Sequence, residues 1–190
     1  MKLFRRQNGI LLLCMLCLFS ASAQDMRMNN LKVTVLSLFS GSTKLTYERA
    51  IADNRSIELT GGVIGWGGDW LNSNASKGAL CRFTYKFIFH PHKEKSRSLN
   101  GFYLKPELAF SSFDFDAKDG SGERLHNNRL AIMGCFGYQI VHRWFVFDIF
   151  GGLGLGIGDL NDYNYYHGFI ALPKNSPTAF TTGFKLGAAF

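Results

Sequence analysis

The sequence predicts an all-β fold, an up-and-down antiparallel transmembrane β-barrel of about eight strands. Segments of about 12 to 14 residues repeatedly alternate apolar and polar side chains with a period of two, which is the side-chain period of a strand. After the first 23 residues, no window is apolar enough for a membrane helix. Only 18% of the 190 residues are charged while 15% are aromatic, a composition that excludes intrinsic disorder.

Residues 1–23 are predicted to be a secretory signal peptide, and residues 24–190 the outer-membrane barrel domain. Three basic side chains within the first six positions precede an apolar run over residues 10–19. The run ends at Ala21-Ser22-Ala23, which supplies the small residues of a cleavage site. Ten apolar residues are too few to span a bilayer, which takes about 20. We therefore expect an exported protein.

The first half of the domain is expected to form four strands. Lys32–Phe39 and Thr43–Ile51 open the domain with the least regular alternation. Arg55–Trp66 and Lys77–Phe89 alternate more clearly, with branched or aromatic side chains on one face and charged or hydroxyl side chains on the other. One alternative stays open: Leu31–Ile51 forms a single bent strand, and residues 168–172 contribute to a replacement hairpin.

Four more strands are expected in the second half, over Gly101–Phe113, Arg129–Val141, Trp144–Ile157 and Phe180–Phe190. The last is the clearest, because large apolar residues alternate with small residues and a lysine up to the terminal phenylalanine. The longer connections would lie at one end of the barrel, and the shorter turns at the other, an asymmetry typical of outer-membrane barrels. The long connections at one end are Gly67–Ser76, Asp114–Asn128 and Gly158–Pro177. The asymmetry is incomplete, because His90–Asn100 is long for a turn at the other end and Ser40–Ser42 is short for a connection at the first.

The charged side chains of the predicted strands fall on one face, which we expect to line the lumen. Buried charges of a single sign are too costly, so the two signs should pair, Glu107 with Lys105 or with an arginine of a neighbouring strand. An eight-stranded barrel has just enough interior for side chains to fill, so no open pore is expected. With Lys32, the predicted lumen network comprises Lys44, Glu48, Glu58, Arg82, Lys86, Lys105, Glu107, Arg129, Asp148 and Lys185.

The exceptions to this sorting, Arg49, Arg55 and Lys77, lie near the ends of strands, where a charge facing lipid costs little. Tyrosine and tryptophan also gather near strand ends, as expected for rings at the headgroup boundary. The predicted aromatic girdle includes Trp66, Trp70, Tyr138 and Trp144. The two cysteines of the domain, Cys81 and Cys135, are expected on opposite faces of strands that are not neighbours, and hence as free thiols.

The chain resembles the small outer-membrane β-barrel proteins of the OmpA/OmpX-like class. The resemblance rests on the closing run from Thr182 to Phe190 and on the segment Leu45-Thr46-Tyr47-Glu48-Arg49. It implies a monomer in the outer membrane of a Gram-negative cell, in contact with membrane lipid and lipopolysaccharide. It also implies that Phe190 is the signal which the barrel-assembly machinery reads. The function implied is structural, or a surface interaction in which the loops contact an extracellular ligand; nucleic acid is not an expected partner.

Two alternative functions remain. His126-Asn127-Asn128 resembles the histidine segment of lipid A deacylase barrels, which would make this chain a lipid-modifying enzyme. Those enzymes need a serine beside the histidine, and the matching position is Asn128; Ser111, Ser112 and Ser121 are other hydroxyls that could approach it. The second alternative is a soluble periplasmic lipid-binding barrel. No catalytic residue, cofactor or metal site is expected from the sequence.

Overall fold

The computed structural model describes residues 28–67, 75–89, 99–117, 121–158, 170–171 and 177–190. The predicted signal peptide, residues 1–23, lies outside this described part. The elements are β1 (Asn29–Thr34), α2 (Val35–Phe39), β2 (Ser42–Ala52), β3 (Arg55–Ile64), β4 (Lys77–Phe89), β5 (Gly101–Asp116), β6 (Arg124–His142), β7 (Phe145–Gly158), β8 (Ile170–Ala171) and β9 (Thr178–Ala189).

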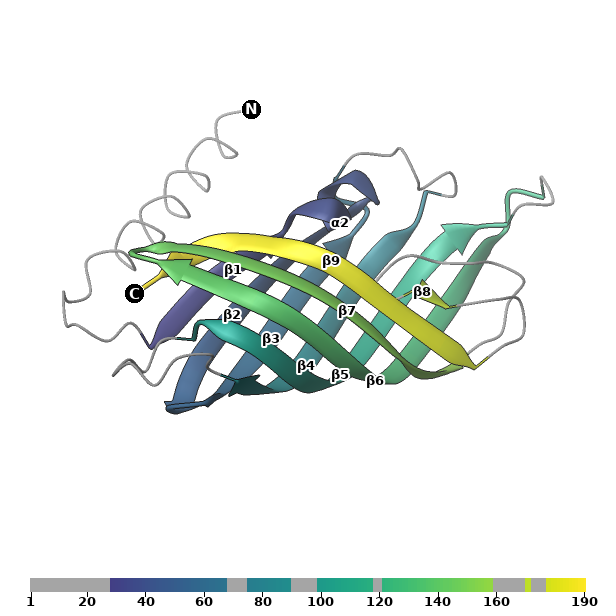
Figure 1. Ribbon diagram of the computed structural model, residues 1–190. Helices are drawn as coiled ribbons and strands as arrows, with labels where there is room; N and C mark the ends of the chain where they lie inside the picture. The colour runs from purple at the N-terminus through teal and green to yellow at the C-terminus, as the bar shows by residue number, and fades with distance from the viewer. Residues whose placement is uncertain (1–27, 68–74, 90–98, 118–120, 159–169, 172–176) are drawn as a thin grey trace, which may run out of the picture.

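The strands form an antiparallel barrel in which each long strand pairs with the next one along the chain (Figure 1). β9 pairs back with β1, and this closes the ring of eight strands. The predicted all-β, up-and-down barrel is thereby confirmed. Among the described residues, none of the helical structure is long and apolar enough to cross a membrane.

Burial alternates along every long strand because successive side chains point to opposite faces of a sheet. In β5, odd-numbered residues are buried in the barrel and most even-numbered residues are exposed on its outer face. The polar residues occupy the interior and the large apolar residues the exterior, the reverse of a water-soluble protein. Leu104, Ile132, Phe136 and Leu155 are all more than half exposed.

Apolar side chains fill the barrel interior near both of its ends. At the end where β3 finishes and β4 begins, Ile64 and Leu80 pack with Phe113 and Phe115. At the opposite end, Leu99 packs in a second cluster with Ala50, Ile88, Tyr103 and Phe150. The charged residues described in the next subsection therefore lie between two apolar layers.

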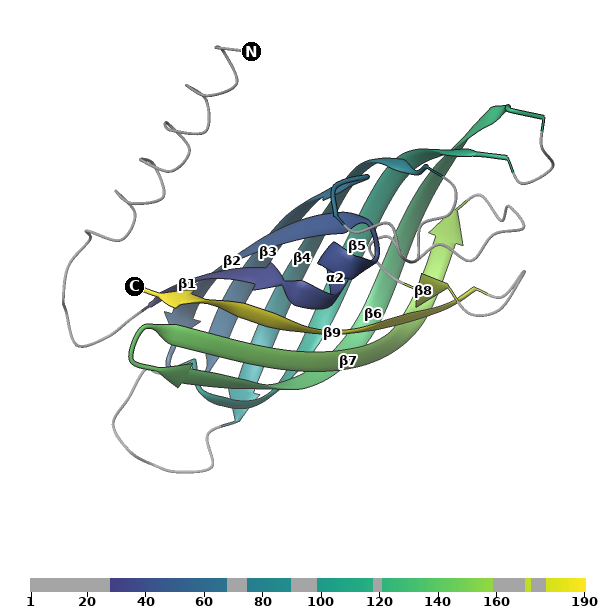
Figure 2. The same ribbon diagram turned by 90° about the horizontal axis from the view of Figure 1, so that it is seen from above.

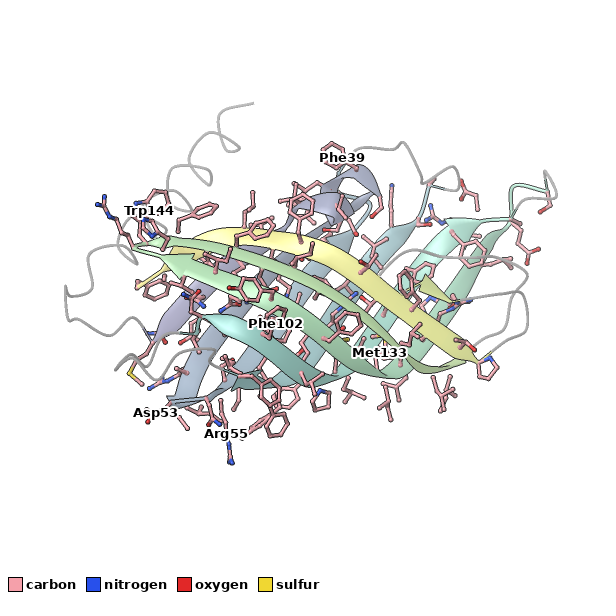
Figure 3. The ribbon with its side chains drawn as sticks, viewed as in Figure 1. Phe39, Asp53, Arg55, Phe102, Met133 and Trp144 are labelled. Atoms are coloured by element: carbon pink, nitrogen blue, oxygen red, sulfur yellow. The ribbon has the colours of Figure 1, made fainter. Side chains whose placement is uncertain are left out.

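The prediction that Lys32–Phe39 is one strand is wrong beyond Thr34. The Val35–Phe39 segment has no alternation, and it forms the short helix α2, in which the Ser37 hydroxyl donates to the Thr34 carbonyl oxygen at 2.7 Å. α2 packs against β2 and β9. Leu36 and Phe39 of this helix are exposed, and Phe39 points away from the barrel (Figure 3).

The alternative of a single bent strand over Leu31–Ile51 is also wrong, because α2 interrupts it. One part of that alternative agrees with the structure: Ile170 and Ala171 pair with Phe180 and Ala179. This short strand, β8, lies beside the first half of β9, which β1 leaves unpaired because it ends at Thr34.

The predicted connection Asp114–Asn128 is mostly strand. β5 continues to Asp116 and β6 begins at Arg124, and the two strands pair throughout. Phe113, Phe115 and Leu125 continue the alternation and place large apolar side chains in the interior, whereas Lys105 and Glu107 on the same face of β5 are charged. The β5–β6 hairpin consequently extends beyond its neighbours at the end away from the C-terminus (Figure 2).

Gly137 tests the packing of the interior. A Cβ atom added at Gly137 would lie 2.5 Å from Cζ of Tyr103, whose ring packs in the apolar cluster that includes Leu99. We expect Gly137→Ala to lower the free energy of unfolding by about 1–3 kcal/mol through overpacking. The control is Gly61→Ala, because a Cβ at Gly61 would have no neighbour within 4 Å. The measurement is the urea midpoint in detergent, and equal midpoints for the two variants would contradict the packing described here.

Candidate functional site

The structure places all ten residues of the predicted lumen network, and Lys32 with them, inside the barrel with their side chains buried. Each of the eight strands that close the ring contributes at least one of them. Seven of the eleven are basic and four are acidic. The three predicted exceptions, Arg49, Arg55 and Lys77, are exposed on the outer face.

Two lysines and three carboxylates form the centre of this network. Lys32 Nζ lies 2.8 Å from Glu48 Oε2 and 2.8 Å from Asp148 Oδ2, and it also bonds Glu58. Lys86 Nζ lies 2.9 Å from Glu58 Oε1, 3.1 Å from Asp148 Oδ2 and 3.3 Å from Glu48 Oε1. Each of the three carboxylates therefore bridges the same two ammonium groups, so no carboxylate in this group is left uncompensated.

Through Glu107, the network continues toward the end of the barrel that holds the apolar cluster of Ile64 and Phe113. Arg82 Nη1 lies 2.8 Å from Glu107 Oε1, and Lys105 Nζ lies 3.1 Å from Glu107 Oε2. These are the two kinds of partner that the sequence predicts for Glu107. Lys105 Nζ also lies 3.6 Å from Glu58 Oε2 and so joins this part to the centre. Lys185 Nζ, on the last strand, lies 2.9 Å from the same Glu58 oxygen.

Several uncharged side chains also belong to the network and were not among the predicted site residues, Gln139 and Tyr103 among them. The Gln139 amide accepts from Lys32 and Lys86 through Oε1 and donates to Glu48 Oε2 at 3.0 Å through Nε2. The Tyr103 hydroxyl donates to Asp148 Oδ1. Their inward positions in the alternation are the signal by which they can be found, because both are polar side chains in phase with the charged residues.

The predicted girdle residues lie toward both ends of the barrel. Trp144, in the β6–β7 turn, lies at the same end as Asp53 and Arg55 (Figure 3). Trp66 follows β3 at the other end, and both tryptophan side chains are exposed. Tyr138 is half-buried on the outer face, against the Phe102 ring at a centroid distance of 4.6 Å. Trp70 lies outside the described residues.

The terminal residue and the cysteines are also placed. The Phe190 amide donates to the Asn29 carbonyl oxygen at 2.9 Å, so the chain end is tied to β1. Cys81 is exposed and Cys135 is buried, on β4 and β6, and both are free as the sequence predicts.

The outer face carries a groove of about 640 Å³ over β5, β6, β7 and β9. Gly137 and Gly151 line it together with Thr182 and with aromatic and aliphatic side chains. Phe102, Phe136, Ile149 and Phe180 are among the residues that line it. The groove belongs to the apolar exterior and holds no charged side chain in its lining.

His126 lies on β6 on the outer face, beyond the end of the apolar exterior. Of the three serines considered in the sequence, Ser112 approaches the imidazole from β5. Ser111 faces the interior, where it is buried, and Ser121 lies in the β5–β6 connection. Among the described residues, no group of three or more His, Cys, Asp or Glu side chains is arranged to hold a metal ion.

No protein-family model matches this chain, and no curated protein or solved structure is significantly similar to it. Any assignment of function therefore rests on the chemistry of the residues themselves.

Glu58 is the sharpest test of the interior network, because its carboxylate contacts Lys32, Lys86 and Lys185. We expect Glu58→Gln to lower the free energy of unfolding by about 3–5 kcal/mol, since it leaves buried ammonium groups uncompensated. The matched control is Glu123→Gln, which removes the same charge from an exposed position of the β5–β6 connection. Urea unfolding in detergent measures both, and a Glu58 variant as stable as the control would contradict the network.

Proposed function

We propose that this chain is an integral outer-membrane β-barrel whose interior is filled by paired charges, and which acts in a structural role or in surface interactions. The observation that carries the proposal is the reversed distribution of side chains. Charged residues are buried inside the closed barrel, while large apolar residues cover its outside.

This distribution favours hydrocarbon over water as the medium around the barrel. Soluble monomers rarely expose contiguous apolar patches of more than a few hundred Å². Here exposed large apolar side chains occur on every strand from β2 to β7. In a bilayer the same surface is favourable, and the ring closure lets β1 and β9 bond each other's backbone over Asn30–Thr34 instead of bonding water.

The positions of the charged side chains on the outer face also favour hydrocarbon as the surrounding medium. Arg55 and Lys77 are the first residues of β3 and β4, and Arg49 lies three residues before the end of β2. A charge on the lipid face costs about 2–4 kcal/mol at the bilayer midplane but only about 0–1 kcal/mol near the interface. The three residues are thus near the levels at which a bilayer tolerates them.

The interior argues against the soluble lipid-binding alternative. A lipid carrier needs an apolar cavity inside the barrel. The described interior instead holds charged residues between two apolar clusters. The same filling disfavours a diffusion pore. Contacts with lipopolysaccharide or an extracellular ligand would then fall to the outer end, where the β5–β6 hairpin extends beyond its neighbours.

Cell fractionation tests the proposed location. We expect the chain in the detergent-extracted outer-membrane fraction, and we expect its gel mobility to change on boiling because a closed barrel unfolds only on heating. Recovery in the periplasm without detergent, with mobility unaffected by heat, would contradict the proposal and favour the soluble alternative.

A matched pair of arginine substitutions tests the lipid contact. Phe136 and Trp144 are 65% and 61% exposed, but Phe136 lies within β6 and Trp144 in the turn at its end. We expect Phe136→Arg to lower the free energy of unfolding from lipid vesicles by about 2–4 kcal/mol, and Trp144→Arg by about 0–1 kcal/mol. Reversible urea unfolding from vesicles measures both. Equal effects of the two substitutions would contradict the placement of Phe136 deeper in hydrocarbon than Trp144.

A further inference from the structure

Four polar side chains meet on the outer face of the β5–β6 hairpin, where the barrel wall ends. Ser112 and Asp114 come from β5, and His126 and Asn128 come from β6. The strand register sets Asp114 opposite His126 and Ser112 opposite Asn128. Side chains directly opposite or diagonal on one face of an antiparallel pair are within contact distance. The register alone therefore brings the four groups together.

The distances order three of these groups into a chain. The Ser112 hydroxyl oxygen lies 3.4 Å from His126 Nε2, and His126 Nδ1 lies 2.6 Å from Asp114 Oδ1. A nucleophile, a base in contact with it and a third group that orients the base is the arrangement of serine hydrolases. It is recognised by geometry rather than by position along the chain.

The Asp114 contact decides which imidazole nitrogen can act as the base. An ionised carboxylate only accepts hydrogen bonds, so the short contact with Asp114 places a proton on Nδ1. In the neutral ring Nε2 then carries a lone pair, and this is the nitrogen that faces Ser112. Asp114 thus holds the imidazole in the tautomer and orientation that can remove the serine proton.

We propose that Ser112, His126 and Asp114 form a catalytic triad that hydrolyses carboxylic esters. Ser112 Oγ attacks the ester carbonyl carbon while its proton passes to His126 Nε2. The tetrahedral intermediate then breaks its bond to the alcohol oxygen, which takes the proton from Nε2 and leaves. Water attacks the acyl-serine in the same way, with Nε2 again accepting a proton and returning it to Ser112. The products are an alcohol and a carboxylic acid, and no oxidant or cofactor is consumed.

Asn128 contacts the same imidazole nitrogen as Ser112. Its Oδ1 lies 3.2 Å from His126 Nε2, and Asn128 is the residue opposite Ser112 across the two strands.

The position of the triad indicates the class of ester. Phe110 and Leu130 lie two residues from Ser112 and Asn128 on the same outer face, and both are exposed. β7 ends opposite Arg129, and β4 begins with Lys77 opposite Asp114, so the triad lies at the edge of the apolar surface. An ester whose acyl chain lies against that surface and whose headgroup lies in water fits this edge. The lipid substrate rests on the proposed membrane location, whereas the triad does not.

The first experiment uses the refolded full-length barrel in detergent and p-nitrophenyl octanoate as the probe. We expect hydrolysis to fall at least about 100-fold in Ser112→Ala and in His126→Gln. We expect Asp114→Asn to lower kcat with KM unchanged, because the ring loses its correct tautomer. Ser121→Ala and Asp116→Asn are matched controls on the same hairpin, and they should keep the activity of the unaltered protein to within about twofold. Heat-dependent gel mobility verifies that each variant is folded.

Covalent labelling tests the assignment of Ser112 as the nucleophile without requiring turnover of an ester. A fluorophosphonate should form a phosphorus–oxygen bond to Ser112 with loss of fluoride, and mass spectrometry should find the adduct on that residue. The adduct should be absent in Ser112→Ala and strongly reduced in His126→Gln. Folded protein with neither ester hydrolysis above that of Ser112→Ala nor a Ser112 adduct would overturn the triad.

Vesicles distinguish the lipid source and separate this proposal from the membrane location. Release of fatty acid from vesicles of phosphatidylethanolamine and phosphatidylglycerol indicates a phospholipid ester, and release from lipopolysaccharide alone indicates the glycolipid. Release from neither, with octanoate ester still cleaved, would overturn the lipid substrate while leaving the triad intact. A soluble chain that cleaves the octanoate ester would overturn the membrane location only.

Discussion

Carboxylates buried inside the barrel must lie within bonding distance of ammonium or guanidinium groups, and this requirement constrains the strands that carry the paired groups. The single carboxylate of Glu58, for example, contacts lysines from β1, β4 and β9. A shift of register by one residue would turn the charged side chains of a strand to the outer face and its apolar side chains to the lumen. Pairing of opposite charges therefore selects both the register and the direction in which the apolar stripe points.

The apolar clusters at the two ends of the barrel strengthen this effect. A layer built on Phe113 and Phe115 covers the charges at one end, and a layer that includes Leu99 and Phe150 covers them at the other. Charges held away from water attract one another more strongly, and they are correspondingly costly to separate. In the proposed function, an interior of this kind acts as a filling of the barrel and not as a path for solutes. Chemistry that requires access to substrate is consequently restricted to the outer surface, where His126 lies.

The strands and the inward direction of the charged side chains could be predicted from the sequence, because a period of two follows directly from backbone geometry. Three features could not. Val35–Phe39 is apolar without alternation, so neither strand nor helix is indicated there. Phe113 and Phe115 point inward, which breaks the polar-inside pattern and hides the extension of β5. The contact between Ser112 and His126 depends on the pairing of two strands across a connection, which local patterns do not specify.

The ring closes along a short edge, since β1 pairs with β9 only from Asn30 to Thr34. Across that edge the first and last strands are also linked by their lysines: Lys32 reaches Asp148 on β7, and Lys185 reaches Glu58 on β3. A sheet that has formed its hairpins but has not joined its two ends lacks these bonds. Joining the ends of the sheet and completing the ion pairs of Glu58 and Asp148 therefore depend on each other. In the proposed bilayer setting, a half-assembled sheet would be unstable, because its charged stripe would face hydrocarbon.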